Sequence, residues 1–196
     1  MRWVMIIWLA VAPVAWAAES FQEKPWEKLS SREVSDWGTV ALGINGGKWK
    51  HGETEHFIIH FTRTGEKAAV RSELFYQKIK VFFGNRADLM PGRKSHVFAF
   101  GEARDWAQFA GKIEQPWAAG ITRGDEFFYN FSDEAGRMAG KAKVTAHEMT
   151  HLMFNRFFVG RLPLWLNEGI AEYFGQRETS TATEIRSEEH TSELQS

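Results

Sequence analysis

Cysteine is absent from this chain of 196 residues. Disulfide bonds are therefore excluded, and so are metal sites built from thiolates, the ligands that structural zinc sites often use. The same absence argues against a lipid anchor on a cysteine behind the amino-terminal apolar stretch.

An excess of charge of one sign is also lacking. The chain carries 24 basic and 25 acidic side chains, and no block of basic residues occurs. Nucleic acid is therefore not indicated as a partner. No internal repeat or low-complexity tract is present either, so one globular domain is expected.

No apolar run is long enough to cross a membrane comfortably. The apolar stretch from Trp3 to Val14 is shorter than the roughly 20 residues that a spanning helix needs. It follows Met1-Arg2 and leads to Ala15-Trp16-Ala17, the three parts of a secretory signal peptide. Residues 1–17 are thus predicted to be a signal peptide, which implies export to the periplasm or the extracellular space and no stable membrane span after cleavage.

The opposite end is unusual. Residues 186–196, Arg-Ser-Glu-Glu-His-Thr-Ser-Glu-Leu-Gln-Ser, resemble the translation of a widely used sequencing adapter, although a polar disordered tail has the same composition. On the first interpretation the natural chain continues past about Ile185, the record is a truncated fragment, and His190 has no role as a ligand.

Between these ends the patterns predict an α+β domain. Residues 18–50 are polar and irregular, and a lead-in without regular structure is expected there. A domain over 51–185 is expected to contain, in order, a strand, a helix, a strand, a short helix, a hairpin and two further helices. These elements are predicted at 55–61, 66–83, 95–100, 102–110, 118–122 with 126–131, 141–158 and 163–174.

The chemistry is concentrated in the last two helices. His147 and His151 are four residues apart, so they project from one face of a helix and can reach one metal ion. Glu168 on the next helix can supply a third ligand, which leaves the open position that catalytic zinc requires. Glu148 projects beside the metal, where a general base for zinc-bound water stands.

These residues carry a resemblance to a known family. The segments His147-Glu-Met-Thr-His151 and Leu162-Pro-Leu-Trp-Leu-Asn-Glu-Gly-Ile-Ala-Glu-Tyr-Phe174 resemble the gluzincin zinc metallopeptidases, and in particular the bacterial peptidase-MA-like group. The resemblance implies the amino-terminal catalytic subdomain of a thermolysin-like fold, with a mixed sheet, here incomplete at its carboxyl terminus. It also implies that His147, His151 and Glu168 bind Zn²⁺, that Glu148 is the base, and that Glu172 orients a ligand histidine.

The expected function is zinc-dependent hydrolysis of peptide bonds in a peptide or protein substrate by zinc-activated water. In the related fold the strand before the metal-binding helix lines the cleft, so Phe127–Phe131 is expected to be the sheet edge that pairs with substrate. A non-catalytic zinc-binding scaffold of the cell envelope, or an inactive relative, remains an alternative. His51, His56 and His60 are expected to lie on the surface or on a strand face, away from the metal.

Overall fold

The computed structural model describes residues 21–63, 65–84, 93–132, 138–157 and 162–177. The predicted signal peptide, residues 178–185 and the adapter-like tail lie outside the described residues. Within the described part of the chain, no helix is both long and apolar enough to cross a bilayer.

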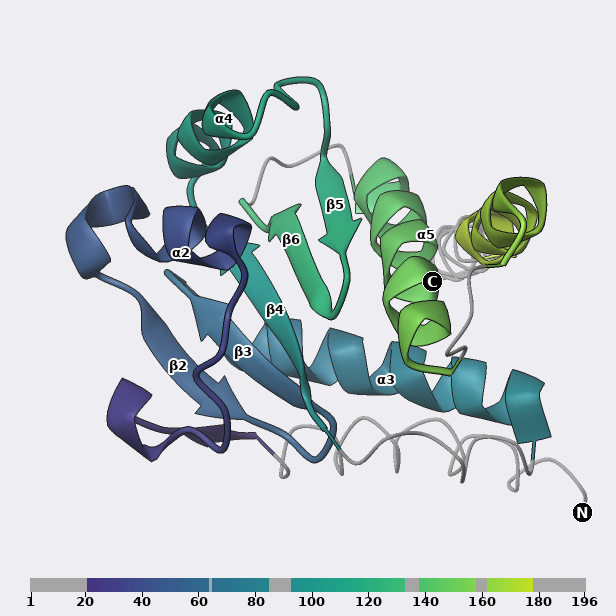
Figure 1. Cartoon of the computed structure of the whole chain (residues 1–196), viewed down its shortest axis with the longest axis horizontal. Coiled ribbons are helices and arrows are strands. Elements are labelled where there is room, and N and C mark those ends of the chain that lie inside the picture. Colours follow the sequence, from purple (N-terminus) through teal and green to yellow (C-terminus); the bar gives the residue numbers. More distant parts are fainter. Residues whose placement is uncertain (1–20, 64, 85–92, 133–137, 158–161, 178–196) are drawn as a thin grey trace, which may run out of the picture.

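A mixed six-stranded sheet forms the centre of an α+β fold (Figure 1). Its order is β1-β2-β3-β4-β6-β5, with β3 and β6 parallel to β4 and all other neighbours antiparallel. The strands are β1 (Gln22–Glu23), β2 (Lys50–Glu53), β3 (Phe57–Phe61), β4 (Ser95–Phe100), β5 (Gly120–Arg123) and β6 (Glu126–Asn130).

Helices cover both faces of this sheet (Figure 1). On one face, α3 (Gly65–Phe83) and α5 (Met138–Phe157) pack on Phe57, Ile59 and Val97. On the other face, α2 (Asp36–Leu42) and α4 (Ala103–Lys112) pack on Phe98, Phe100 and Phe128. Because both faces are covered, β3 and β4 are buried along their whole lengths and show no alternation of apolar and polar residues.

The prediction of an irregular lead-in over 18–50 is wrong for residues 21–50. This segment contains β1, the 3-10 turns Trp26–Lys28 and Ile44–Gly47, α2 and the first residue of β2. Ser35 caps α2 by accepting hydrogen bonds from the backbone N–H groups of Trp37 and Gly38. The helix is only seven residues long, too short to show a helical period, yet Ala41 within it and Ile44 after it are fully buried.

Strand β2 (Lys50–Glu53) was not predicted either. The other elements agree with the prediction in type and order, with ends displaced by at most a few residues. One final helix occupies residues 164–177, and we call it the glutamate helix because it carries Glu168. It was expected to end at residue 174, but it continues for three residues beyond that position.

The prediction that Phe127–Phe131 forms the sheet edge is also wrong. Strand β6 is paired on both sides, with β4 and with β5, and the edge is β5. The cause is the hairpin: its first strand continues the sheet outward, while its second strand returns into the sheet beside β4. Sequence order along a hairpin does not indicate which of its strands lies outside.

Candidate metal centre

Helix α5 presents a different stripe of side chains to each of its neighbours. Met149, Leu152 and Met153 are fully buried against the sheet and α3. His147 and His151 lie on an adjacent stripe that faces the glutamate helix, and Glu148 faces β5. The helical spacing that builds the core therefore also places two imidazoles and a carboxylate on fixed sides of α5.

The glutamate helix packs against α5 and α3. Its Ala171 is fully buried, and the ring of Phe174 meets the ring of Phe75 on α3 edge to face. A Cβ atom at Gly175 would lie 3.1 Å from the backbone oxygen of Lys143 and 3.6 Å from Cβ of His147. The glycine therefore lets the two helices approach closely, directly beside the candidate ligand His147.

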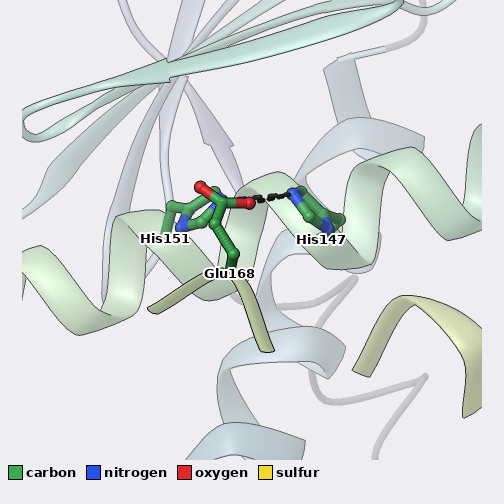
Figure 2. Close-up of side chains that lie close together, drawn as sticks. All are labelled: His147, His151 and Glu168. Carbon is green, nitrogen blue, oxygen red and sulfur yellow. Dashed lines mark hydrogen bonds and ion pairs between the residues drawn. The ribbon is translucent and has the colours of Figure 1, made fainter. Parts of the chain in front are cut away.

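Three ligand atoms meet where these two helices approach (Figure 2). The Nε2 atoms of His147 and His151 are 3.1 Å apart, and the Glu168 carboxylate oxygens lie 3.5 Å and 3.6 Å from them. Zinc bonds of about 2.0–2.2 Å in tetrahedral geometry would separate neighbouring ligand atoms by about 3.4 Å. The group could therefore hold a metal ion, and its two nitrogens and one carboxylate suit zinc.

The centre is open on one side. The side chains of His147 and His151 are 23% and 14% exposed, whereas that of Glu168 is 51% exposed. Three protein ligands with an accessible face leave room for a further ligand, which is the arrangement of catalytic rather than structural zinc sites.

Asn167 is a site residue that the sequence analysis missed. Its Oδ1 lies 3.1 Å from Nδ1 of His151. An amide oxygen can only accept, so Nδ1 of His151 donates, and Nε2 of the neutral ring is left with a lone pair toward the other ligand atoms. The available signal was the position of Asn167 directly before Glu168, but only the helix packing shows which histidine it meets.

Glu172 lies near the other histidine without a hydrogen bond to it. Its Oε2 atom is 3.7 Å from Nδ1 of His147, beyond hydrogen-bonding distance, while Oε1 accepts from Nζ of Lys143 at 2.6 Å. The hydrogen bond from Lys143 lowers the pKa of Glu172 and keeps it anionic. Its orienting role toward His147 remains a prediction.

Replacing Asn167 with alanine is expected to weaken the binding of added Zn²⁺ to this group roughly 10- to 100-fold, because outer partners of ligand histidines typically contribute that much. Competition with a zinc-sensitive dye would measure the affinity. Asn155→Ala is the matched control, since Asn155 is exposed and its amide donates to the backbone oxygen of Gly124. Equal zinc affinity of the Asn167 variant and the wild type would contradict the role assigned to Asn167.

Glu148 lies between the ligand group and strand β5. The Thr122 hydroxyl donates to the backbone oxygen of Glu148 at 2.7 Å, and a Cβ atom at Gly120 would lie 3.5 Å from Cγ of Glu148. Burial raises the pKa of Glu148, while the positive charge of His151 and hydrogen bonds from Thr122 lower it. A carboxylate with a raised pKa beside a metal site is suited to accept a proton.

Burial also lowers the pKa of His147, and the neighbouring His151 lowers it further. Both effects favour the neutral imidazole, which is the form that binds a metal. His51, His56 and His60 take no part in this centre: His51 and His60 lie on β2 and β3, and His56 lies just before β3.

No protein family, curated protein or solved structure was found to match this chain.

Proposed function

We propose that the protein is a zinc-dependent metallopeptidase of the gluzincin type. The observation that carries the proposal is the position of Glu148 between three convergent metal ligands and the edge strand of the sheet. A structural metal site needs no carboxylate in that position, whereas hydrolysis needs a base there.

His147, His151 and Glu168 would hold the zinc ion. When bound, zinc supplies a Lewis acid that polarises a carbonyl group and makes water a better nucleophile at neutral pH. Glu148 takes a proton from the attacking water and can return it to the leaving nitrogen. Asn167 keeps the ring of His151 in the tautomer and orientation that this arrangement requires.

Strand β5 is suited to bind an extended peptide. Strand β5 pairs with β6 next to a two-residue turn, and the Asn130 N–H donates to the oxygen of Ala119. In this register alternate residues of β5 direct their backbone groups toward β6. The N–H and C=O groups of Gly120 and Thr122 therefore point outward from the sheet. The backbone amide of Thr122 lowers the pKa of Glu148. Both groups of Gly120 and the carbonyl of Thr122 are suited to pair with a substrate strand.

A Thr122→Val variant is expected to lower kcat with little change in KM or in zinc affinity. Valine keeps the shape of threonine but removes the hydroxyl that ties β5 to the backbone of Glu148. Loss of one such positioning contact is expected to cost about tenfold in rate, because small displacements of a catalytic group are costly. Thr122→Ser restores the hydroxyl and should restore most of the activity, and a fully active valine variant would contradict this role.

The proposed function is tested by digestion of a broad peptide library with zinc-loaded protein. Hydrolysis that a chelator abolishes and added zinc restores is the expected result. Stoichiometric zinc with no cleavage of any peptide would favour the alternative, a non-catalytic zinc-binding scaffold. Absence of zinc from the purified protein would contradict both.

Export to the periplasm or the extracellular space belongs to the same proposal. Cell fractionation of a tagged protein, with sequencing of its amino terminus, would test cleavage behind Ala17.

A further inference from the structure

Three histidines form a row on the sheet face opposite the metal centre. They come from adjacent strands: His51 from β2, His60 from β3 and His96 from β4. Side chains alternate between the two faces of a strand, so His96 shares a face with Phe98 and not with Val97. Phe98 packs toward α2 and α4, whereas α5 packs on the face that carries Val97. The row is therefore separated from the metal ligands by the sheet itself.

The three imidazoles contact one another in sequence. Nδ1 of His51 lies 2.8 Å from Nδ1 of His60, and Nε2 of His60 lies 2.9 Å from Nδ1 of His96. The rings of His60 and His96 are nearly parallel, with 8° between their planes. His60 is completely buried and His96 is 4% exposed. Both nitrogens of the middle ring are thus occupied by other imidazoles.

The number of protons in this row follows from its contacts. Three neutral imidazoles carry one ring N–H proton each. Each of the two N···N contacts needs one proton to be a hydrogen bond, so the third proton lies on an outer nitrogen, Nε2 of His51 or Nε2 of His96. One added proton fills the other outer nitrogen and leaves both hydrogen bonds intact. A second added proton has no free nitrogen and must break a contact.

We propose that His51, His60 and His96 together form a binding site for a single proton, with the positive charge shared along the row. The site is distinct from the metal centre and does not depend on the proposed peptidase activity. Its outer residues lie at two surface cavities. The cavity beside His51 is also lined by Trp26 and Glu27, and the cavity beside His96 is also lined by Lys94 and Glu126.

The charged groups around the row favour positive charge at its ends. Glu27, on the 3-10 turn Trp26–Lys28, stabilises a proton on His51, and Glu53 on β2 stabilises one on His96. Several other charged groups near the row have partners of their own. Lys24 and Lys94 bind Glu53, and Glu126, the register partner of His96 on β6, accepts from Ser35. Arg93 pairs with Asp125, and Lys50 pairs with Glu23. The apolar surroundings of His60, chiefly Phe98 and Trp26, offer no counter-charge.

The direction of the pH response follows from burial. Burial lowers the pKa of all three rings, to about 4 for His96 and well below 6.5 for His60. Because the unfolded chain binds protons more readily, the row contributes its full stability above pH 6.5 and loses it as the pH falls from about 6.5 toward 4. Glu53 does not titrate in this window: burial alone would raise its pKa, but hydrogen bonds from Ser30, Lys94 and Lys24 lower it to about 2.

Trp26 reports on this site. Its ring centroid lies 5.2 Å from that of His51 and 5.8 Å from that of His60. The segment that carries Trp26 is attached to the sheet through the two-residue strand β1 and through contacts with Glu53. We therefore expect this segment to be the first to separate when a second proton breaks the row.

The test is an NMR titration of the full chain with ¹⁵N-labelled histidine from pH 7.5 to 4. We expect the three rings to share one midpoint below the ordinary histidine value, with the scalar couplings across both N···N contacts persisting after the first proton. His56, which binds Glu73 outside the row, is the internal control, because its ring signals should be the same in the wild type and in a variant that interrupts the row. Three unrelated midpoints, or loss of a coupling with the first proton, would overturn the proposal.

A His60→Phe variant should uncouple the row. Phenylalanine keeps a ring on Phe98 but has no nitrogen, so His51 and His96 should titrate separately, while the ring signals of His56 should keep their wild-type positions. In the His60→Phe variant, the change of Trp26 fluorescence in acid should also be lost. A Trp26→Phe variant shows which part of the total fluorescence comes from Trp26. If His60→Phe does not fold, the shared or separate midpoints of the wild-type rings still decide the matter.

Discussion

Replacing Glu148 with glutamine is expected to reduce peptide hydrolysis by about 10²- to 10⁴-fold, the usual contribution of a general base. Glutamine keeps the size and hydrogen-bonding capacity of the side chain but cannot take a proton from water. The three ligand side chains are untouched, so zinc should remain bound at one ion per chain. Initial rates on a peptide cleaved by the wild type, together with metal analysis of both proteins, measure the two effects.

Glu66→Gln is the matched control for this variant. It makes the same change of charge at an exposed position in the first turn of α3, and it should leave the rate unchanged. A Glu148 variant that keeps wild-type activity would show that Glu148 is not the base. A variant that loses both zinc and activity would show instead that this carboxylate contributes to metal binding.

Replacing Arg156 with methionine is expected to lower the free energy of unfolding by about 3 kcal/mol, or the Tm by roughly 10 °C. Arg156 lies near the end of α5 and is 4% exposed. Its guanidinium donates to the backbone oxygens of His56 and Arg93, which precede β3 and β4. Methionine fills similar space but removes the guanidinium donor from both carbonyl groups. The oxygen of His56 still accepts from Ser95 N–H, so most of the cost is expected from the lost bond to Arg93 and from the lost anchoring of α5 to the starts of β3 and β4.

Urea-induced unfolding followed by circular dichroism would measure this effect. Arg63→Met is the control, because Arg63 is 67% exposed and its ion pair with Glu102 should contribute no more than about 1 kcal/mol. Equal losses in the two variants would contradict the assigned role of Arg156. Replacing Glu73 should lower the free energy of unfolding by a comparable amount. This buried carboxylate on α3 accepts hydrogen bonds from the backbone N–H and the ring of His56.

Local patterns were sufficient to predict the longer helices and the ligand group. The apolar spacing of α5 and of α3 is visible in the chain, and the interval between His147 and His151 alone places both on one helical face. Glu168 was predicted from the motif around it, and the structure brings it to both histidines. The zinc ion and the catalytic role of Glu148 remain predictions, because geometry shows only that the group can hold a metal.

The sheet order was decided by tertiary structure. Strand pairing depends on contacts between distant residues, and the sequence of a hairpin is compatible with either of its strands at the edge. For this reason β5, not the segment Phe127–Phe131, emerged as the edge. The short helix α2 was missed because its burial comes from packing on the sheet and not from its own periodicity.

By itself, then, the sequence determined the longer helices, the α+β class and the residues able to bind a metal, because these depend on spacings of a few residues. Only the tertiary structure decided which side chains meet across elements: Asn167 with His151, Thr122 with Glu148, and the three histidines of the row. Their partners lie between 9 and 36 residues apart in the chain. No local spacing encodes such contacts, because they arise only when the sheet and its helices pack together.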